Sequence, residues 1–197
     1  GHLTFKMFRY AQMMLYRNPE KHKKIMKRLN AFEEESDREE IELAKYLAKV
    51  STHNLSNKAS LEMRSMWTMI NELERIGDIC YRLGEIIERK IKMRVQFTEE
   101  TDKEIQELFE MVEDAYDYML RNLAGDSDTA IVPFEEVSDI EQRINEKRSE
   151  LRNQQFIEIE NDTISFQTGL LAIEIISSLE KVGDHIYIVN QAFLGIK

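Results

Sequence analysis

The chain has 197 residues, with only seven Gly and two Pro and with 32% charged residues, a composition typical of long helices rather than of a sheet. Its formal net charge of −10 argues against general nucleic-acid binding, which depends on Lys and Arg neutralising phosphates. The single cysteine, Cys80, excludes an intrachain disulfide and a cysteine-based zinc site. The composition therefore predicts an all-α protein in a reducing, cytoplasmic setting.

Breaker residues divide the sequence into six predicted helices. The boundaries lie, in chain order, at Asn18-Pro19, at residues 51–57, at Gln96-Phe97-Thr98, at Gly125-Asp126-Ser127-Asp128 and at Asn161-Asp162. Thr98 precedes an acidic first turn and is the predicted N-cap of the fourth helix, which runs to Leu123. The fifth helix begins near Pro133. The sixth helix has apolar residues at three- and four-residue spacings, so we expect it to be central, and Trp67 is expected in the core.

Two sequence patterns recur in the same order, which predicts an internal repeat. The pattern F-E-E-x-S-D-x-E occurs at residues 32–39 and returns 102 residues later at 134–141. The pattern L-E-R-I-G-D at residues 73–78 returns 106 residues later as L-E-K-V-G-D at 179–184. Two copies of a three-helix unit explain both matches. We therefore predict two tandem three-helix bundles, over residues 1–95 and 96–197.

The start of the chain differs from the start of the second repeat. Met14-Leu15 resembles Met119-Leu120. The helix that contains Met119 is predicted to begin about 21 residues earlier, at Thr98, and the corresponding start for Met14 would fall before residue 1. We therefore expect a truncated first helix in a piece of a longer protein. Residues 1–30 carry eight Lys and Arg against Glu20 alone, which is +7, and the other 167 residues carry −17. Such a segment suits an anionic membrane surface or a solvated helix end.

Each repeated pattern contains two acidic residues four positions apart, which share one face of a helix. The pairs are Glu33 and Asp37, Glu74 and Asp78, Glu135 and Asp139, and Glu180 and Asp184. Like charges at this spacing destabilise a helix by a few tenths of a kcal/mol, and a divalent cation would compensate them. In each repeat the two pairs are equidistant from a predicted turn, so a helical hairpin would bring four carboxylates to one level. We therefore predict a divalent-metal site in each unit.

Each of these features also has a simpler explanation. Asp and Glu make up 37 of the 197 residues, so the pairs could form a solvated face, with Arg75 and Lys181 as ordinary ion-pair partners. Gly77 and Gly183 are costly inside helices and would allow either close helix packing or room for a metal. His185 is expected to be a surface or core histidine rather than a ligand.

The segments E-R-I-G-D at 74–78 and E-K-V-G-D at 180–184 resemble the signature of the PhoU family of phosphate-uptake regulators. The resemblance covers nearly the whole chain and implies two three-helix bundles. It also implies that E-or-D-x-x-x-D motifs take part in multinuclear clusters of iron, zinc or another divalent metal, with manganese and magnesium also open. The family motif itself maps onto Glu74, Asp78, Glu180 and Asp184, and its expected partners are Glu33, Asp37, Glu135 and Asp139.

PhoU-like domains also occur as the cytoplasmic C-terminal part of sodium/phosphate cotransporter-like membrane proteins. The truncated first helix and the basic start favour that setting, at the cytoplasmic face of a membrane. The resemblance implies a regulatory domain without catalytic activity, whose partners are a membrane transporter domain or phosphate-transport and signalling proteins, with self-association open. The alternatives are a free-standing PhoU regulator, a metal-dependent phosphohydrolase and a helical adaptor without metal. A ferritin-like oxidase is disfavoured because no histidine has a Glu three residues before it.

Overall fold

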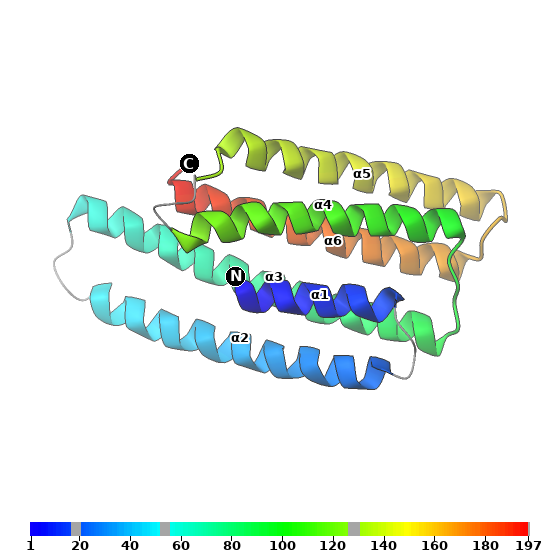
Figure 1. Cartoon of the computed structure of the whole chain (residues 1–197), viewed down its shortest axis with the longest axis horizontal. Helices are drawn as coiled ribbons and strands as arrows, with labels where there is room; N and C mark the ends of the chain where they lie inside the picture. The colour runs from blue at the N-terminus through cyan, green and yellow to red at the C-terminus, as the bar shows by residue number, and fades with distance from the viewer. Residues whose placement is uncertain (17–20, 52–55, 126–130, 197) are drawn as a thin grey trace.

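The protein is a bundle of long helices that run side by side (Figure 1). The computed structural model describes residues 1–16, 21–51, 56–125 and 131–196. The helices are α1 (His2–Tyr16), α2 (His22–Ser51), α3 (Asn57–Lys92), α4 (Glu99–Ala124), α5 (Phe134–Glu160) and α6 (Phe166–Leu194). No strand occurs in these described ranges. The prediction of an all-α fold is confirmed.

The helices pack as two groups of three. Within the first unit α3 contacts α1 and α2, which also contact each other, and within the second unit α6 contacts α4 and α5 in the same way. The two units meet mainly where α3 packs against α6 (Figure 1). This arrangement confirms the predicted architecture of two tandem three-helix bundles, and the division near residue 95 stays a prediction.

The ends of α4 show how local chemistry sets the boundaries. Thr98 adopts an extended conformation, and its side chain accepts a hydrogen bond from the backbone N–H of Thr101 at 3.1 Å. At the other end Gly125 has φ of 58°, a left-handed conformation that glycine adopts without strain. The N-cap prediction is therefore correct. The predicted breaks at Asn18-Pro19, Thr52-His53-Asn54 and Asp126-Ser127-Asp128 lie outside the described residues.

One hydrophobic core joins the two units. Phe8 of α1 stacks on Phe109 and Tyr116 of α4 with ring centroids 5.3 and 5.2 Å apart, and all three side chains are fully buried. The apolar side chains of α6 belong to the same core, as expected for a central helix. The prediction that Trp67 is a core residue is wrong, because its side chain is 43% exposed and lines a surface hollow together with residues of α2 and α3.

The described helices do not include one that is both long enough and apolar enough to cross a membrane.

Candidate metal centre

Three acidic side chains of the first unit meet where α2 packs against α3. Glu33 and Asp37, one turn apart on α2, face Asp78 of α3, and one carboxylate oxygen of each lies within 4.8 Å of the others. We call these three residues the acidic cluster. Glu74 lies one turn before Asp78 on the same helix, as the spacing of the sequence pattern predicts. The structure thus brings together three of the four acids that the hairpin argument placed at one level in this unit, and Glu74 lies beside them.

The electrostatics of this region show an excess of negative charge. Burial raises the pKa of Glu33, and neighbouring Asp37 and Asp78 raise it further. Burial also raises the pKa of Glu74, with Asp78, Glu40 and Asp37 adding to the effect. Burial is the larger cause of both rises and the neighbouring negative charges add to it, while Arg75 opposes the rise at Glu74. The acids of this region therefore repel one another, and the cation of Arg82 lies 3.8 Å from Asp78.

Gly77 explains how the two helices come so close. A Cβ atom added to Gly77 would lie 3.3 Å from Oγ of Ser36 on α2. In the second unit a Cβ atom on Gly183 would lie 3.2 Å from Cδ1 of Ile144 on α5. Of the two explanations for these helical glycines, these contacts support close helix packing.

The glycine contacts also show which residues of α2 and α5 occupy equivalent positions. Gly77 and Gly183 match in the repeat, so Ser36 and Ile144 are equivalent, which is a separation of 108 residues rather than the 102 of the sequence match. At this separation the equivalent pairs are Glu33 with Glu141, Asp37 with Asn145, and Glu40 with Arg148. The charges of the two units are therefore different at two of these three positions.

The second unit supplies its own hydrogen-bond donors to its carboxylates. Arg148 of α5 forms an ion pair with the buried Glu180 of α6, and its Nε donates to Oε1 of Glu180 at 3.1 Å. Asn145 donates from Nδ2 to Oε1 of Glu141 at 2.6 Å. Among the described residues no trio of ligand-bearing side chains comparable to the acidic cluster occurs in this unit.

Asp184 of the second unit lies near two other carboxylates. Burial raises its pKa to about 6, and Glu180 and Glu141 contribute to the rise, whereas His185 and Arg148 oppose it. Glu141 is thus a neighbour of Asp184, as Glu33 is a neighbour of Asp78, which supports the 108-residue equivalence of α2 and α5. Sequence reasoning did not single out Glu40, Glu141, Asn145 or Arg148.

The structure does not bring Glu135 and Asp139 to Glu180 and Asp184, contrary to the hairpin prediction. They lie six residues before Glu141 and Asn145, which is about 9 Å along a helix. Asp139 is 71% exposed and lies 3.8 Å from Arg143 in an ordinary i,i+4 pair. The F-E-E-x-S-D-x-E match thus reflects two similarly acidic helices rather than equivalent positions.

Comparison with known proteins relates the sequence and the fold of this chain to PhoU. The family model of the PhoU domain matches residues 1–87. The resemblance to PhoU is confirmed. The crystal structure of PhoU from Pseudomonas aeruginosa is similar in fold, with a TM-score of 0.74 and 14% identity, covering 98% of this chain and 89% of that chain. A sequence search of curated proteins found no match.

The PhoU match includes every residue of the acidic cluster as well as Glu40 and Glu74. Helices α4 to α6 are PhoU-like in fold, through the match of the whole chain to the solved PhoU structure. The acidic cluster therefore lies in the part of the chain that matches PhoU both in sequence and in fold.

His185 and Arg75 have structural partners in this PhoU-like bundle. Nδ1 of His185 contacts Oε2 of Glu72 across the packing of α3 on α6, and Nη1 of Arg75 donates to Oε1 of the same carboxylate at 2.9 Å. Glu72 is buried, so these two contacts balance its charge. The expectations that Arg75 forms an ordinary ion pair and that His185 is structural agree with this arrangement.

Proposed function

We propose that the chain is a PhoU-like regulatory domain in the control of phosphate uptake, and that it binds a divalent cation at the acidic cluster. The observation that carries the metal proposal is the approach of Glu33, Asp37 and Asp78 to within 4.8 Å, inside the region that matches the PhoU domain. The regulatory role is supported by the PhoU match and the PhoU-like fold. In this proposal the domain binds its ligands and partners and does not catalyse a reaction.

The donor set fits a hard or borderline divalent cation. Carboxylate oxygens suit magnesium and manganese, and they also occur as ligands of iron and zinc. The cluster has three carboxylates and further acids beside it, so a cation would remove repulsion that the protein alone leaves in place. Glu33, Asp37 and Asp78 would hold the ion, and Glu74, one turn before Asp78, would support the site. The cation would join α2 to α3 and serve structure or sensing.

Elemental analysis of protein purified without chelator, followed by calorimetric titration with manganese and magnesium, tests the metal proposal. We expect retained or titratable divalent metal in the unmodified protein. Asp78→Asn should weaken binding by at least about tenfold, the effect typical of disturbing even outer partners of a metal. Asp139→Asn is the matched control, since it makes the same change at an exposed acid of α5. Absence of bound metal after titration, or equal binding by both variants, would refute the site.

Phosphate uptake by cells of the source organism tests the regulatory role. Deletion of the gene should change the rate of phosphate uptake under phosphate-rich conditions, and a copy that encodes Asp139→Asn should restore it. A copy that encodes Asp78→Asn should fail to restore it if the cation is part of signalling. An unchanged uptake rate after deletion would contradict a role in phosphate uptake, whatever the outcome of the metal titration.

Association with a membrane transporter is a finer proposal, supported by the basic residues near the start of the chain. Lys23, Lys24 and Lys27 are exposed on the first turns of α2, and such residues suit the anionic cytoplasmic face of a membrane. Co-sedimentation with vesicles that contain anionic lipid should fall when these three lysines are changed to Glu. Binding that is equal for vesicles with and without anionic lipid would exclude the electrostatic contact.

A further inference from the structure

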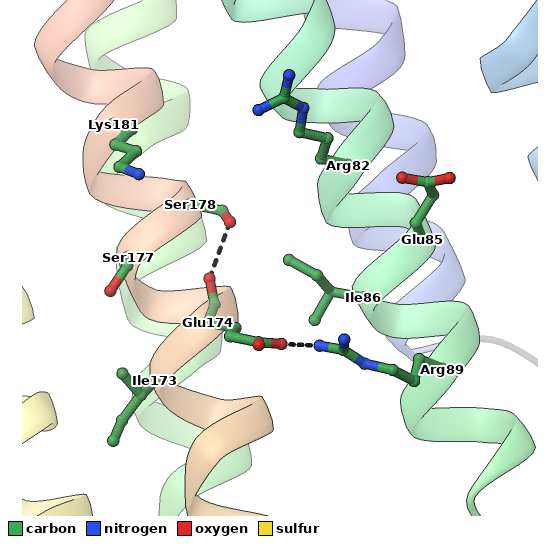
Figure 2. A pocket seen from close by; sticks show the side chains of 9 residues that line it. All are labelled: Arg82, Glu85, Ile86, Arg89, Ile173, Glu174, Ser177, Ser178 and Lys181. Atoms are coloured by element: carbon green, nitrogen blue, oxygen red, sulfur yellow. Dashed lines mark hydrogen bonds and ion pairs between the residues drawn. The ribbon is translucent and has the colours of Figure 1, made fainter.

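Two cations face each other across the packing of α3 on α6. Arg89 of α3 and Glu174 of α6 form an ion pair that sets the antiparallel register of these helices. Arg82 lies seven residues, or about two turns, before Arg89 on α3, and Lys181 lies seven residues after Glu174 on α6. These two residues are therefore at the same level. Figure 2 shows both side chains extending from their helices into the space between them.

The space between these side chains is a hollow open to solvent. A cavity of about 530 Å³ is lined by Arg82, Arg89, Lys181, Glu174, Ser178 and Ile86, among others. A second hollow of about 390 Å³ shares Arg82 and Lys181 with it and continues toward Arg75 and His185. Arg82 and Lys181 thus stand where the two hollows meet. We call these two adjoining hollows the α3–α6 groove.

The lining of the groove includes four basic side chains on a chain whose net charge is −10, and three acidic side chains, Asp78, Glu85 and Glu174, lie among them. Arg75, Arg82 and Arg89 recur every seven residues along one side of α3. The first and last of these arginines are bonded to Glu72 and Glu174. Arg82 lies 3.8 Å from Asp78, but its side chain is 72% exposed, and such pairs contribute little.

Lys181 adds a charge that the protein does not balance. Among the described residues it has no ion-pair or hydrogen-bond partner, and it lies opposite Arg82. Two cations at one level across a hollow repel each other, and an anion between them would turn that repulsion into two attractions. The volume of the hollow is within the range of small-molecule sites.

We propose that the α3–α6 groove binds a tetrahedral oxyanion between Arg82 and Lys181, as inorganic phosphate or as the phosphate group of a small monoester. The guanidinium of Arg82 offers a planar fork that matches two oxygens of a phosphate, and the ammonium of Lys181 supplies a point charge opposite it. The hydroxyl of Ser178 already donates to the carbonyl of Glu174 at 2.8 Å, so the two cations are the ligands. Binding at the groove does not require a metal at the acidic cluster.

Titration at constant ionic strength tests the site, with inorganic phosphate in one series and glycerol phosphate in another. We expect saturable binding in the micromolar to millimolar range, and the tighter series identifies a free or an esterified phosphate as the ligand. Arg82→Gln and Lys181→Gln should each weaken binding by about tenfold, the effect of losing one charge-assisted hydrogen bond. Arg143→Gln is the matched control, because this exposed arginine of α5 has the same 3.8 Å i,i+4 pair with an aspartate.

Thermal unfolding without ligand should be the same for the three variants, since all these side chains lie at the surface. Binding of neither phosphate compound at millimolar concentration would overturn the proposal. So would equal binding by Lys181→Gln and Arg143→Gln, or full competition by chloride at equal ionic strength. If an acidic peptide such as polyglutamate binds with the same sensitivity to the variants while phosphate does not, the groove is a protein-docking surface and the oxyanion site is refuted.

Discussion

The two units carry the same carboxylates on α3 and α6 but different partners on α2 and α5. In the first unit Glu40 lies near Glu74, whereas in the second its equivalent, Arg148, bonds Glu180. The second unit therefore balances the buried Glu180 with its own arginine, whereas the first unit has another acid at the equivalent position. The comparison replaces the prediction of a metal site in each unit with the proposal of one, in the first unit.

The most severe test of this comparison is Arg148→Glu. The change removes the partner of the buried Glu180 and adds a further acid, as in the first unit. We expect the metal-free protein to lose about 3 kcal/mol in its free energy of unfolding, measured in urea with chelator present. Saturating manganese should recover part of the loss. The control Arg143→Glu should cost less than about 1 kcal/mol, and equal losses for the two variants would contradict the difference between the units.

The titration of Asp184 tests how well the second unit is balanced. Its pKa is raised to about 6 in the folded protein, against about 3.9 in an unfolded chain. Between these values the folded state binds a proton that the unfolded state does not, so the destabilisation present at pH 7 is lost as the pH falls toward 4. Asp184→Asn should therefore be more stable than the unmodified protein at pH 7, by about 1 kcal/mol after allowing for its half-exposed position.

Urea unfolding at pH 7 and at pH 4.5 gives the measurement for Asp184. The advantage of Asp184→Asn should shrink at the lower pH. A constant difference between the two proteins at both values would mean that Asp184 is already balanced in the folded state.

Glu40→Arg makes the reverse exchange in the first unit. A cation introduced beside Glu74 should raise the stability of the metal-free protein by about 0.5 kcal/mol, the value of a surface pair. It should also abolish the extra stability that manganese gives to the unmodified protein. Thermal unfolding with and without manganese measures both effects. Retained stabilisation by manganese would place the metal elsewhere.

The smallest expected effects come from the two helical glycines. Replacing glycine by alanine gains up to about 1 kcal/mol of helix propensity. At Gly77 the added carbon meets the hydroxyl of Ser36, which can rotate away, so Gly77→Ala should stabilise by a few tenths of a kcal/mol. At Gly183 it meets two carbons of the stiff, branched Ile144 at 3.2 and 3.3 Å, so Gly183→Ala should be neutral or slightly destabilising. Urea midpoints in the opposite order would contradict the packing described for these helices.

The helices and the first-unit acids could be predicted from the sequence because their determinants are local. Thr98 caps α4 through its own side chain, and Glu33 and Asp37 share a face through helical spacing alone. The register of α5 against α6 is not local. The turn that separates them covers residues 161–165, so the centre of the hairpin lies beyond the Asn161-Asp162 pair used to predict it.

Because the predicted centre of the α5–α6 hairpin was a few residues too early, the prediction did not place Arg148 and Asn145 beside the acids of α6. A hairpin centre a few residues later places Ile144 opposite Gly183 and brings Arg148 toward Glu180, as the structure shows. The misplaced F-E-E-x-S-D-x-E match supported the wrong centre, because acidic helices resemble each other in composition whatever their register. The register of these helices is read from the close contacts at Gly77 and Gly183, and such contacts are known only from the packed structure.

The 3.8 Å pair between Asp78 and Arg82 joins the two proposed ligand positions. Asp78 belongs to the acidic cluster and Arg82 to the α3–α6 groove, one helical turn away. A cation that engages Asp78 would leave Arg82 free for an anion. Thermodynamic linkage then requires the anion to tighten cation binding by the same factor. Because the Arg82–Asp78 pair is exposed and weak, the coupling carried by this single turn of α3 should be small, so each ligand should bind only slightly more tightly in the presence of the other.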